Sequence, residues 1–230
     1  MIVCHEHKFI FLKTQKTAGT SIECALSAFC GPDDIITPVS SSDEHLRQGR
    51  GPQNWRLPHV PWYKTALRPL NFYKDRTNRA RFWHHMPAER IRAEVGEQVW
   101  KSYFKFAVER NPWDRQISLY KYRKRKKRRA DMTLEEFMRE ERIARLKNFH
   151  IYSIDGKVEA DFVCQFDNLA EDVGKALAQV GIMQPLNLPR AKGQYRSGDQ
   201  RPYRDFYTDE TRAIVADWYA PEIRHFGYEF

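Results

Sequence analysis

Three short apolar runs along the chain have the length and composition of buried β-strands. They cover residues 8–13, 104–108 and 162–166, and each is followed by a turn and then by apolar positions with helical spacing. A strand followed directly by a helix, repeated three times, is typical of a parallel sheet covered by helices. We therefore expect an α/β fold with a central parallel β-sheet flanked by helices.

Apolar residues three or four positions apart predict the helices that accompany these strands. The expected helices cover residues 20–29, 87–100, 169–180 and a last stretch from about 208, with others beginning near 112 and 134. Asn111 can cap a helix whose first turn contains Pro112. Thr133 and Glu136 have the spacing of a capping box.

Residues 31–83 differ from the rest of the chain. They contain six prolines, several glycines and little clean periodicity. A long irregular stretch inside a compact domain is usually functional or mobile. Trp55, Arg56, Trp62 and Tyr63 either line an acceptor cleft or pin this segment to the core, and the sequence favours neither interpretation.

The composition is that of a folded chain. Hydrophobic residues make up 41% and aromatic residues 13% of the 230 positions, which excludes a disordered polar chain. We expect residues 1–230 to form a single domain, with residues 31–83 as an irregular proline-rich insertion.

No apolar run approaches the roughly 18 residues of a membrane span, and no secretory signal precedes the first predicted strand. Four cysteines are too few for a disulfide scaffold, so we expect reduced thiols and a cytoplasmic location.

The segment Cys4-His5-Glu6-His7 has the residue types of a metal site. His5 and His7 would share one face of a strand, but no second pair of ligands has the usual spacing. An exposed strand edge near the N-terminus is the simpler interpretation.

Positive charge is in excess, with 39 Lys and Arg against 30 Asp and Glu and a net charge of +9. Taken alone, this excess indicates an anionic partner such as nucleic acid, an acidic glycan or a phosphate-rich cofactor. The run 121–129 contains eight positive charges and no negative ones, so it accounts for nearly all of the excess. No known nucleic-acid-binding motif accompanies it. The run is either a solvated helix end or a docking patch for an acidic polysaccharide.

The turn after the first predicted strand has the chemistry of an anion site. It combines the cation Lys16, a glycine at position 19 and several hydroxyls at the start of a helix. The free N–H groups and the dipole of a helix N-terminus attract phosphate or sulfate. The chain contains no G-x-x-x-x-G-K-[ST] sequence, so this turn is not a Walker A loop.

The turn after the second predicted strand indicates a second anion site. Arg110 stands where that strand ends, and Ser118 lies about two turns into the following helix. An arginine fork beside a hydroxyl suits a separate phosphate. The alternative is a structural ion pair of Asp114 with Arg110 or with Arg115.

Together the two turns resemble the sulfotransferases that use 3′-phosphoadenosine 5′-phosphosulfate (PAPS). The likeness is greatest to the carbohydrate branch, which includes heparan sulfate 2-O-sulfotransferase, the chondroitin and HNK-1 enzymes and bacterial members. Residues 16–21 are similar to the 5′-phosphosulfate loop of that family, and Arg110 with Ser118 to its 3′-phosphate motif. The resemblance covers residues 8–30 and about 84–230, and we find none in 31–83.

The resemblance implies a P-loop-like nucleotide-binding fold and in-line transfer of a sulfuryl group from PAPS to a hydroxyl, with a carbohydrate as the expected acceptor. Lys16 would hold the 5′-phosphosulfate and neutralise charge on its bridging oxygen, while Arg110 and Ser118 would bind the 3′-phosphate. Further donors to the cofactor would come from Thr17, Ala18, Gly19, Thr20 and Ser21. Arg196 and Arg201 would belong to a basic loop that closes over the cofactor.

The acceptor hydroxyl needs a general base, and histidine is the natural one near neutral pH. The resemblance places a catalytic histidine in this region of the chain, and the bacterial pattern H-x-x-A matches His85, with His84 as the reserve. Family members work without a catalytic metal, so we predict none.

Two other functions compete with this one. A small-molecule kinase or another nucleotide-dependent transferase would use the same turns, but the Walker lysine is missing. A nucleic-acid-binding protein would use the run 121–129, although we expect no nucleic acid partner. The acceptor is expected to be a glycan or another hydroxyl-bearing molecule, and the position of the basic run favours an anionic one. The sequence does not indicate the oligomeric state.

Overall fold

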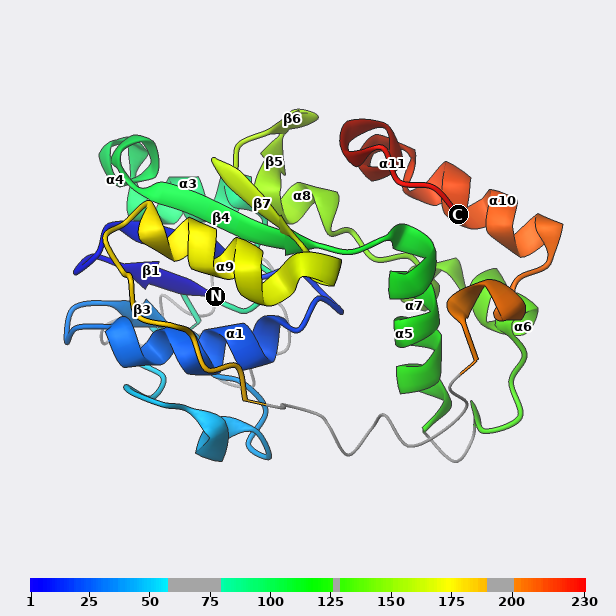
Figure 1. Cartoon of the computed structure of the whole chain (residues 1–230), viewed down its shortest axis with the longest axis horizontal. Helices are drawn as coiled ribbons and strands as arrows, with labels where there is room; N and C mark the ends of the chain where they lie inside the picture. Colours follow the sequence, from blue (N-terminus) through cyan, green and yellow to red (C-terminus); the bar gives the residue numbers. More distant parts are fainter. Residues whose placement is uncertain (58–79, 126–128, 190–200) are drawn as a thin grey trace, which may run out of the picture.

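A five-stranded sheet forms the centre of the computed structural model, which describes residues 1–57, 80–125, 129–189 and 201–230. The strand order is β3-β1-β2-β4-β7 (Figure 1). The strands are β1 (Ile2–Cys4), β2 (Phe9–Leu12), β3 (Ile35–Ile36), β4 (Phe104–Glu109) and β7 (Phe162–Gln165). β2, β4 and β7 are parallel, which confirms the three predicted strands and their direction.

The sheet is mixed, however, and the expectation of a wholly parallel sheet is wrong. β1 runs antiparallel to both β2 and β3, and Ile2 pairs with Phe11 on one side and Ile36 on the other. In the segment Cys4 to His7, Cys4 ends β1 and is buried, whereas residues 5–7 form a turn in which Glu6 is exposed. The predicted exposed strand edge is therefore wrong for Cys4, and residues 5–7 are not part of a strand. Strands of two or three residues are too short for periodicity to reveal them.

Helices cover both faces of the sheet (Figure 1). On one face lie α1 (Gly19–Leu26) and α9 (Leu169–Ala178), and on the other α3 (Ala88–Val95), α4 (Glu97–Ser102) and α8 (Phe149–Tyr152). Phe11 and Phe106 pack towards the first pair of helices, and Ile10 and Leu12 towards the second group. Successive side chains of a strand point to opposite faces, so each strand contributes to two cores.

The predicted helix over 87–100 is in fact two helices. Gly96, with φ of 85°, ends α3 and begins α4, because a left-handed residue interrupts the helical hydrogen bonding. Gly181, with φ of 77°, follows α9 where the sequence predicted its end.

Trp55 is half-buried against the core beside α3, which favours the interpretation that it pins the segment 31–83 to the core. Trp62 and Tyr63 lie outside the described residues.

A group of helices beside the sheet has its own apolar core (Figure 1). It contains α5 (Pro112–Lys124), α6 (Leu134–Arg139), α7 (Glu141–Ala144), α10 (Asp209–Trp218) and α11 (Ala220–Phe226), and a small hairpin of β5 (Ser153–Ile154) and β6 (Lys157–Val158) follows α8. The predicted caps at Asn111 and Thr133 are confirmed. Within the described segments, no helix is long and apolar enough to cross a membrane.

A buried ionic network joins α5 to the sheet. Arg115 is fully buried and pairs with Glu109 at the end of β4 and with Glu222 of α11, 3.3 Å away. Tyr152 donates its hydroxyl to the other oxygen of Glu109, at 2.9 Å. Burial alone would lower the pKa of Arg115, but the two carboxylates raise it above its usual range, so the guanidinium stays charged.

Candidate active site

The turn between β2 and α1 is held in shape by hydroxyls that face inward. Thr14 and Thr17 are buried and their hydroxyl oxygens lie 2.7 Å apart. The Thr14 hydroxyl also donates to the carbonyl of Val108 in β4. The predicted cofactor residue Thr17 therefore uses its hydroxyl within the turn, and its backbone N–H is what it can offer to a ligand.

The backbone of this turn is unusual at three of the predicted cofactor positions. Lys16 and Ala18 have φ of 65° and 60°, a left-handed conformation that costs energy for any residue but glycine. A Cβ atom on Gly19 would lie 3.3 Å from the carbonyl oxygen of Thr14 and 2.9 Å from the Lys13 side chain, so this close approach favours glycine. The side chain of Ala18 has no polar atom that could cap α1. The first amides of α1, which include those of Thr20 and Ser21, thus form a helix N-terminus suited to an anion.

Asn148 also binds this turn, and no sequence pattern predicted it. Its side-chain oxygen accepts from the N–H of Gln15 and its amide donates to the carbonyl of Gln15, both at 3.0 Å. Asn148 is fully buried just before α8 and lies 133 positions away in the chain. A single asparagine so distant carries no local signal, so only the folded structure reveals the contact.

The second turn, between β4 and α5, meets the first through Arg110. Its guanidinium donates to the carbonyl of Lys16 at 3.3 Å, pairs with Asp114 at 2.6 Å and stacks 4.1 Å from the ring of Phe166. The pairing with Asp114 is thus real, while the alternative pair of Asp114 with Arg115 does not form, since Arg115 binds Glu109 and Glu222.

Ser118 lies on α5 and is half-buried. It is four positions after Asp114, so the two side chains are on one helical face. That face also carries the ion pair of Asp114 with Arg110. The structure therefore places Ser118 on the side of α5 where Arg110 and the first turn meet.

His85 lies against the start of the first turn. Its Nδ1 is 2.8 Å from the carbonyl oxygen of Lys13, and its backbone has a left-handed φ of 66°. A carbonyl only accepts hydrogen bonds, so Nδ1 carries the proton and the neutral ring leaves a lone pair on Nε2. Burial, the Lys13 ammonium and the neighbouring His84 lower the pKa of His85 well below its usual range. His85 is half-buried and His84 exposed, with their rings edge to face at 5.0 Å.

Beneath the turn, a buried carboxylate holds Lys13. Glu23 of α1 is fully buried, its Oε2 accepts from Lys13 Nζ at 2.5 Å, and its Oε1 accepts from the Thr37 hydroxyl at 2.9 Å. Arg47 lies 3.7 Å from the same carboxylate. Burial by itself would raise the pKa of Glu23, but Lys13 and the other surrounding cations lower it to about 2.

The predicted basic loop is only partly described. Arg196 lies outside the described residues. Arg201 is exposed and its guanidinium stacks 4.5 Å from the ring of Phe206, in a short 3-10 helix, η6 (Tyr203–Phe206). Lys121 of α5 lies 4.6 Å from the same ring. Arg201 is thus placed beside the last turns of α5.

Among the described residues, one cluster has the residue types of a metal site, and it is not at these turns. It comprises Cys4, Cys30 and Asp34. Cys4 pairs with the first residue of β2, so the cluster lies at the opposite end of the sheet. Asp34 already accepts from three backbone N–H groups, and hydrogen bonding with Cys30, burial and Asp34 raise the pKa of Cys4 above its usual range. These groups anchor a loop, and the four cysteines are buried and form no disulfide.

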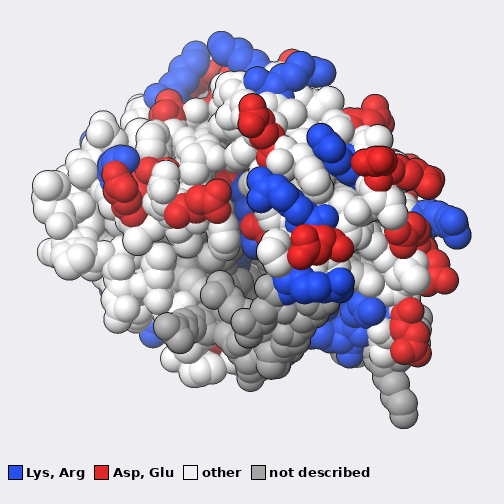
Figure 2. All heavy atoms as spheres, turned by 45° about the vertical axis from the view of Figure 1, so that its right-hand side comes forward, with Lys and Arg blue, Asp and Glu red and all other residues white. Residues whose placement is uncertain are grey.

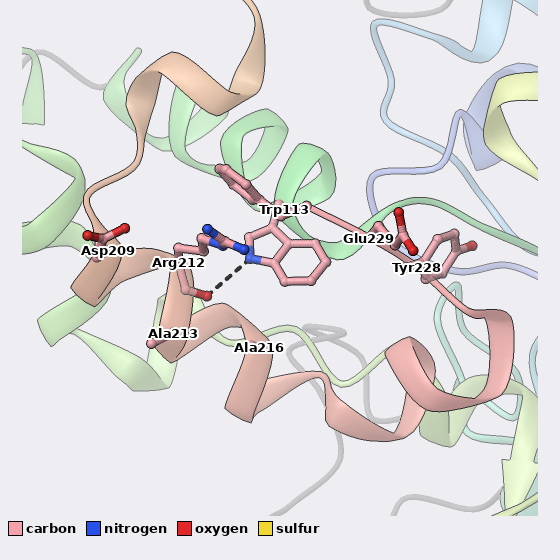
Figure 3. A pocket seen from close by; sticks show the side chains of 8 residues that line it. Trp113, Asp209, Arg212, Ala213, Ala216, Tyr228 and Glu229 are labelled. Atoms are coloured by element: carbon pink, nitrogen blue, oxygen red, sulfur yellow. Dashed lines mark hydrogen bonds between the residues drawn. The ribbon is translucent and has the colours of Figure 1, made fainter.

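A pocket of about 590 Å³ lies on another face of α5 (Figure 3). Its lining comes from Trp113, Asp209, Arg212, Ala213, Ala216, Tyr228, Glu229 and Phe230. The indole of Trp113 donates to the carbonyl of Arg212 at 3.1 Å, which ties α5 to α10. None of the predicted site residues lines this pocket.

Replacing Glu23 tests whether the buried pair with Lys13 supports the turn. Because the pKa of Glu23 is about 2 when folded and about 4.5 when exposed, its ionised form stabilises the fold fully above pH 4.5. This stabilisation, roughly 3 kcal/mol, is lost as the pH falls from 4.5 to 2. Urea unfolding should therefore show Glu23→Gln less stable than wild type at pH 6, with the difference shrinking towards pH 2.

A matched control is Glu141→Gln, which removes an exposed partner of Arg145. Its effect should stay within about 0.5 kcal/mol at every pH. A Glu23→Gln protein as stable as wild type at pH 6 would contradict the structural role of the pair.

Comparisons with known proteins found two similarities. A family model described as the sulfotransferase family matches residues 1–229, and the match includes residues 31–83, where the sequence alone showed no likeness. An uncharacterized protein of Archaeoglobus fulgidus is 34% identical over 106 residues, which are 45% of this chain and 88% of that protein. No solved structure matches the chain.

Proposed function

This chain belongs to the sulfotransferase family, and from that premise we propose that it transfers a sulfuryl group from PAPS to an acceptor hydroxyl. The observation that carries the proposal is the contact between the two anion turns, where Arg110 donates to the carbonyl of Lys16. A donor with a 5′-phosphosulfate and a 3′-phosphate needs two anion sites a short distance apart. The P-loop-like fold implied by the resemblance is part of this proposal.

The described residues suit such a donor. Lys16 and the amides at the start of α1 would hold the 5′-phosphosulfate, while Arg110 and Ser118 would hold the 3′-phosphate. When bound, PAPS supplies an activated sulfuryl group whose leaving group is a phosphate. The chain's task is then to position the reactants and to stabilise charge with Lys16, as protein groups do in phosphoryl transfer.

His85 is the proposed general base. Its Nδ1–H donates to the Lys13 carbonyl, so Nε2 accepts the proton of the acceptor hydroxyl. The lowered pKa keeps the imidazole neutral at pH 7, which a base requires. The same hydrogen bond fixes the ring against the turn that carries Lys16.

The acceptor is proposed to be an anionic carbohydrate. On the face seen in Figure 2, the described Lys and Arg side chains are interspersed with Asp and Glu. The excess of positive charge is instead concentrated in the run 121–129. Residues 121–124 of that run are the last of α5 and follow Ser118, so a negatively charged glycan held there would lie near the cofactor motif. Screening polysaccharides and small glycosides with ³⁵S-labelled PAPS identifies the acceptor.

Thermal unfolding with adenosine 3′,5′-bisphosphate tests the cofactor site. A ligand at 100 times its dissociation constant stabilises a protein by about 2.7 kcal/mol, which raises the Tm of a domain of this size by several degrees. Arg110→Ala should abolish most of this shift, because the 3′-phosphate loses its charged partner. Asp114→Asn is the control, since it breaks the same ion pair but keeps Arg110, and it should retain the full shift. An undiminished shift in Arg110→Ala would contradict the assignment.

His85→Asn tests the base. Asparagine can still donate a hydrogen bond to the Lys13 carbonyl, but it has no basic nitrogen, so kcat should fall about 10²- to 10⁴-fold with bisphosphate affinity unchanged. In wild type, kcat should decline on the acid side only well below pH 6.5, because protonation of Nε2 then removes the base. His84→Asn should retain most activity. If His84→Asn loses the activity and His85→Asn keeps it, the two roles are reversed.

Neutralising part of the basic run tests the acceptor. Lys126, Lys127 and Arg128 are the best choice, because Lys121 and Arg125 contact aromatic rings of the fold. Replacing all three by glutamine should raise the KM for the anionic acceptor about tenfold and weaken its dependence on salt. The affinity for adenosine 3′,5′-bisphosphate should not change. Equal losses of both affinities would count against an acceptor-docking role.

A further inference from the structure

Tyr122 presents an aromatic ring to the predicted catalytic lysine. The Nζ atom of Lys16 lies 4.6 Å from the ring centre of Tyr122, and the guanidinium of Arg125 lies 4.2 Å from the same centre. Both distances are within the range of cation–π attraction. The ring thus faces two cations, one from the first turn and one from its own helix.

The exposure of this ring is exceptional for its surroundings. Among the described residues, Tyr122 and Met183 are the two large hydrophobic side chains with the greatest exposure, and Tyr122 is 38% exposed. Its neighbour in the helix, Tyr120, is by contrast buried in the helical core. Core packing therefore does not explain an aromatic residue at position 122.

Tyr122 lies on the same face of α5 as Asp114 and Ser118 of the second turn. Asp114, Ser118 and Tyr122 follow one another at four-residue spacing, so they share one helical face. At one end of this face Asp114 binds Arg110, and at the other Tyr122 contacts Lys16. One face of one helix therefore contacts both cations of the proposed cofactor site.

We propose that Tyr122 is a positioning residue that holds the ammonium of Lys16 at the transfer site. This inference rests on the proposed function, in which Lys16 stabilises charge on the leaving oxygen. The backbone of Lys16 is already fixed, because its carbonyl accepts from Arg110 and its φ is left-handed. The contact with the ring restricts the rotamers of its long side chain, which reduces the entropy lost when the ammonium takes up its catalytic position.

The attraction is that of an exposed cation–π pair, so the expected effect is modest but measurable. Tyr122→Leu should lower kcat about two- to fivefold and weaken the affinity for adenosine 3′,5′-bisphosphate by no more than that factor, because Lys16 is one of several groups proposed to hold the 5′-phosphate. Tyr122→Phe should retain the activity, because the ring and its quadrupole remain. Phenylalanine analogues with one, two and three ring fluorines at position 122 should lower kcat step by step, since fluorine weakens the negative face of the ring. A purely structural role would not produce this gradation.

A double-mutant cycle shows whether Tyr122 acts through Lys16. In a Lys16→Met protein, Tyr122→Leu should cause no further loss, because the cation is already absent. A further loss equal to that in wild type would overturn the proposal, and so would a fluorinated series with constant kcat.

A measurement without catalysis separates this inference from the proposed function. The ring current of Tyr122 should shift the NMR signals of the Lys16 side-chain methylene protons upfield, and Tyr122→Leu should remove that shift. Unchanged Lys16 signals would overturn the contact even in an active enzyme. A protein that shows the shift but transfers no sulfuryl group from PAPS to any acceptor would overturn the proposed function and leave the contact established.

Discussion

The parallel pairing of β2 with β4 is the constraint on which the candidate site depends. In this register Leu12, the last residue of β2, lies opposite Ala107 of β4, so the two strands end side by side. Their following turns must then emerge at the same edge of the sheet, where ligands of open α/β sheets bind. The hydroxyl of Thr14 reaches the carbonyl of Val108, and Arg110 reaches the carbonyl of Lys16. Two segments more than ninety residues apart thus become one surface.

A buried carboxylate lies beneath each turn. Glu23 pairs with Lys13, and the carbonyl of Lys13 accepts a hydrogen bond from His85. Glu109 pairs with Arg115 and also accepts a hydrogen bond from the backbone N–H of Arg110, at 2.9 Å. Burying such charges is costly unless each is paired and hydrogen-bonded. Here each pair connects a helix to the backbone of a turn. The desolvation is therefore offset by contacts that fix the groups proposed to bind phosphate and to accept the proton.

Much of this arrangement could be predicted from local patterns. The strands over 104–108 and 162–166 and the cap at Asn111 are confirmed, because apolar runs and capping side chains act over a few residues. The short strand Ile2–Cys4 was not predicted, since its pairing depends on partners at 9–11 and 35–36. The break at Gly96 was also missed, because a helical pattern continues across it.

Contacts between distant segments explain what the sequence could not reveal at the site. The hydrogen bonds of Asn148 with Gln15 and the contact of the Tyr122 ring with Lys16 join residues that are far apart in the chain, so no local sequence pattern predicts them. Likewise, the choice between His85 and His84 rested on a resemblance. The structure adds a physical reason to prefer His85, which is its hydrogen bond to the Lys13 carbonyl and its lowered pKa.

Calorimetric titration with adenosine 3′,5′-bisphosphate and with adenosine 5′-monophosphate tests the joined two-phosphate site most directly. The two ligands differ only in the 3′-phosphate, which Arg110 and Ser118 are proposed to bind. A charge-assisted hydrogen bond of about 1.5–3 kcal/mol predicts that the bisphosphate binds roughly 10- to 100-fold more tightly, without any need for Mg²⁺. Equal affinities for the two nucleotides, or tight binding of ATP only in the presence of Mg²⁺, would contradict a PAPS site at these two turns.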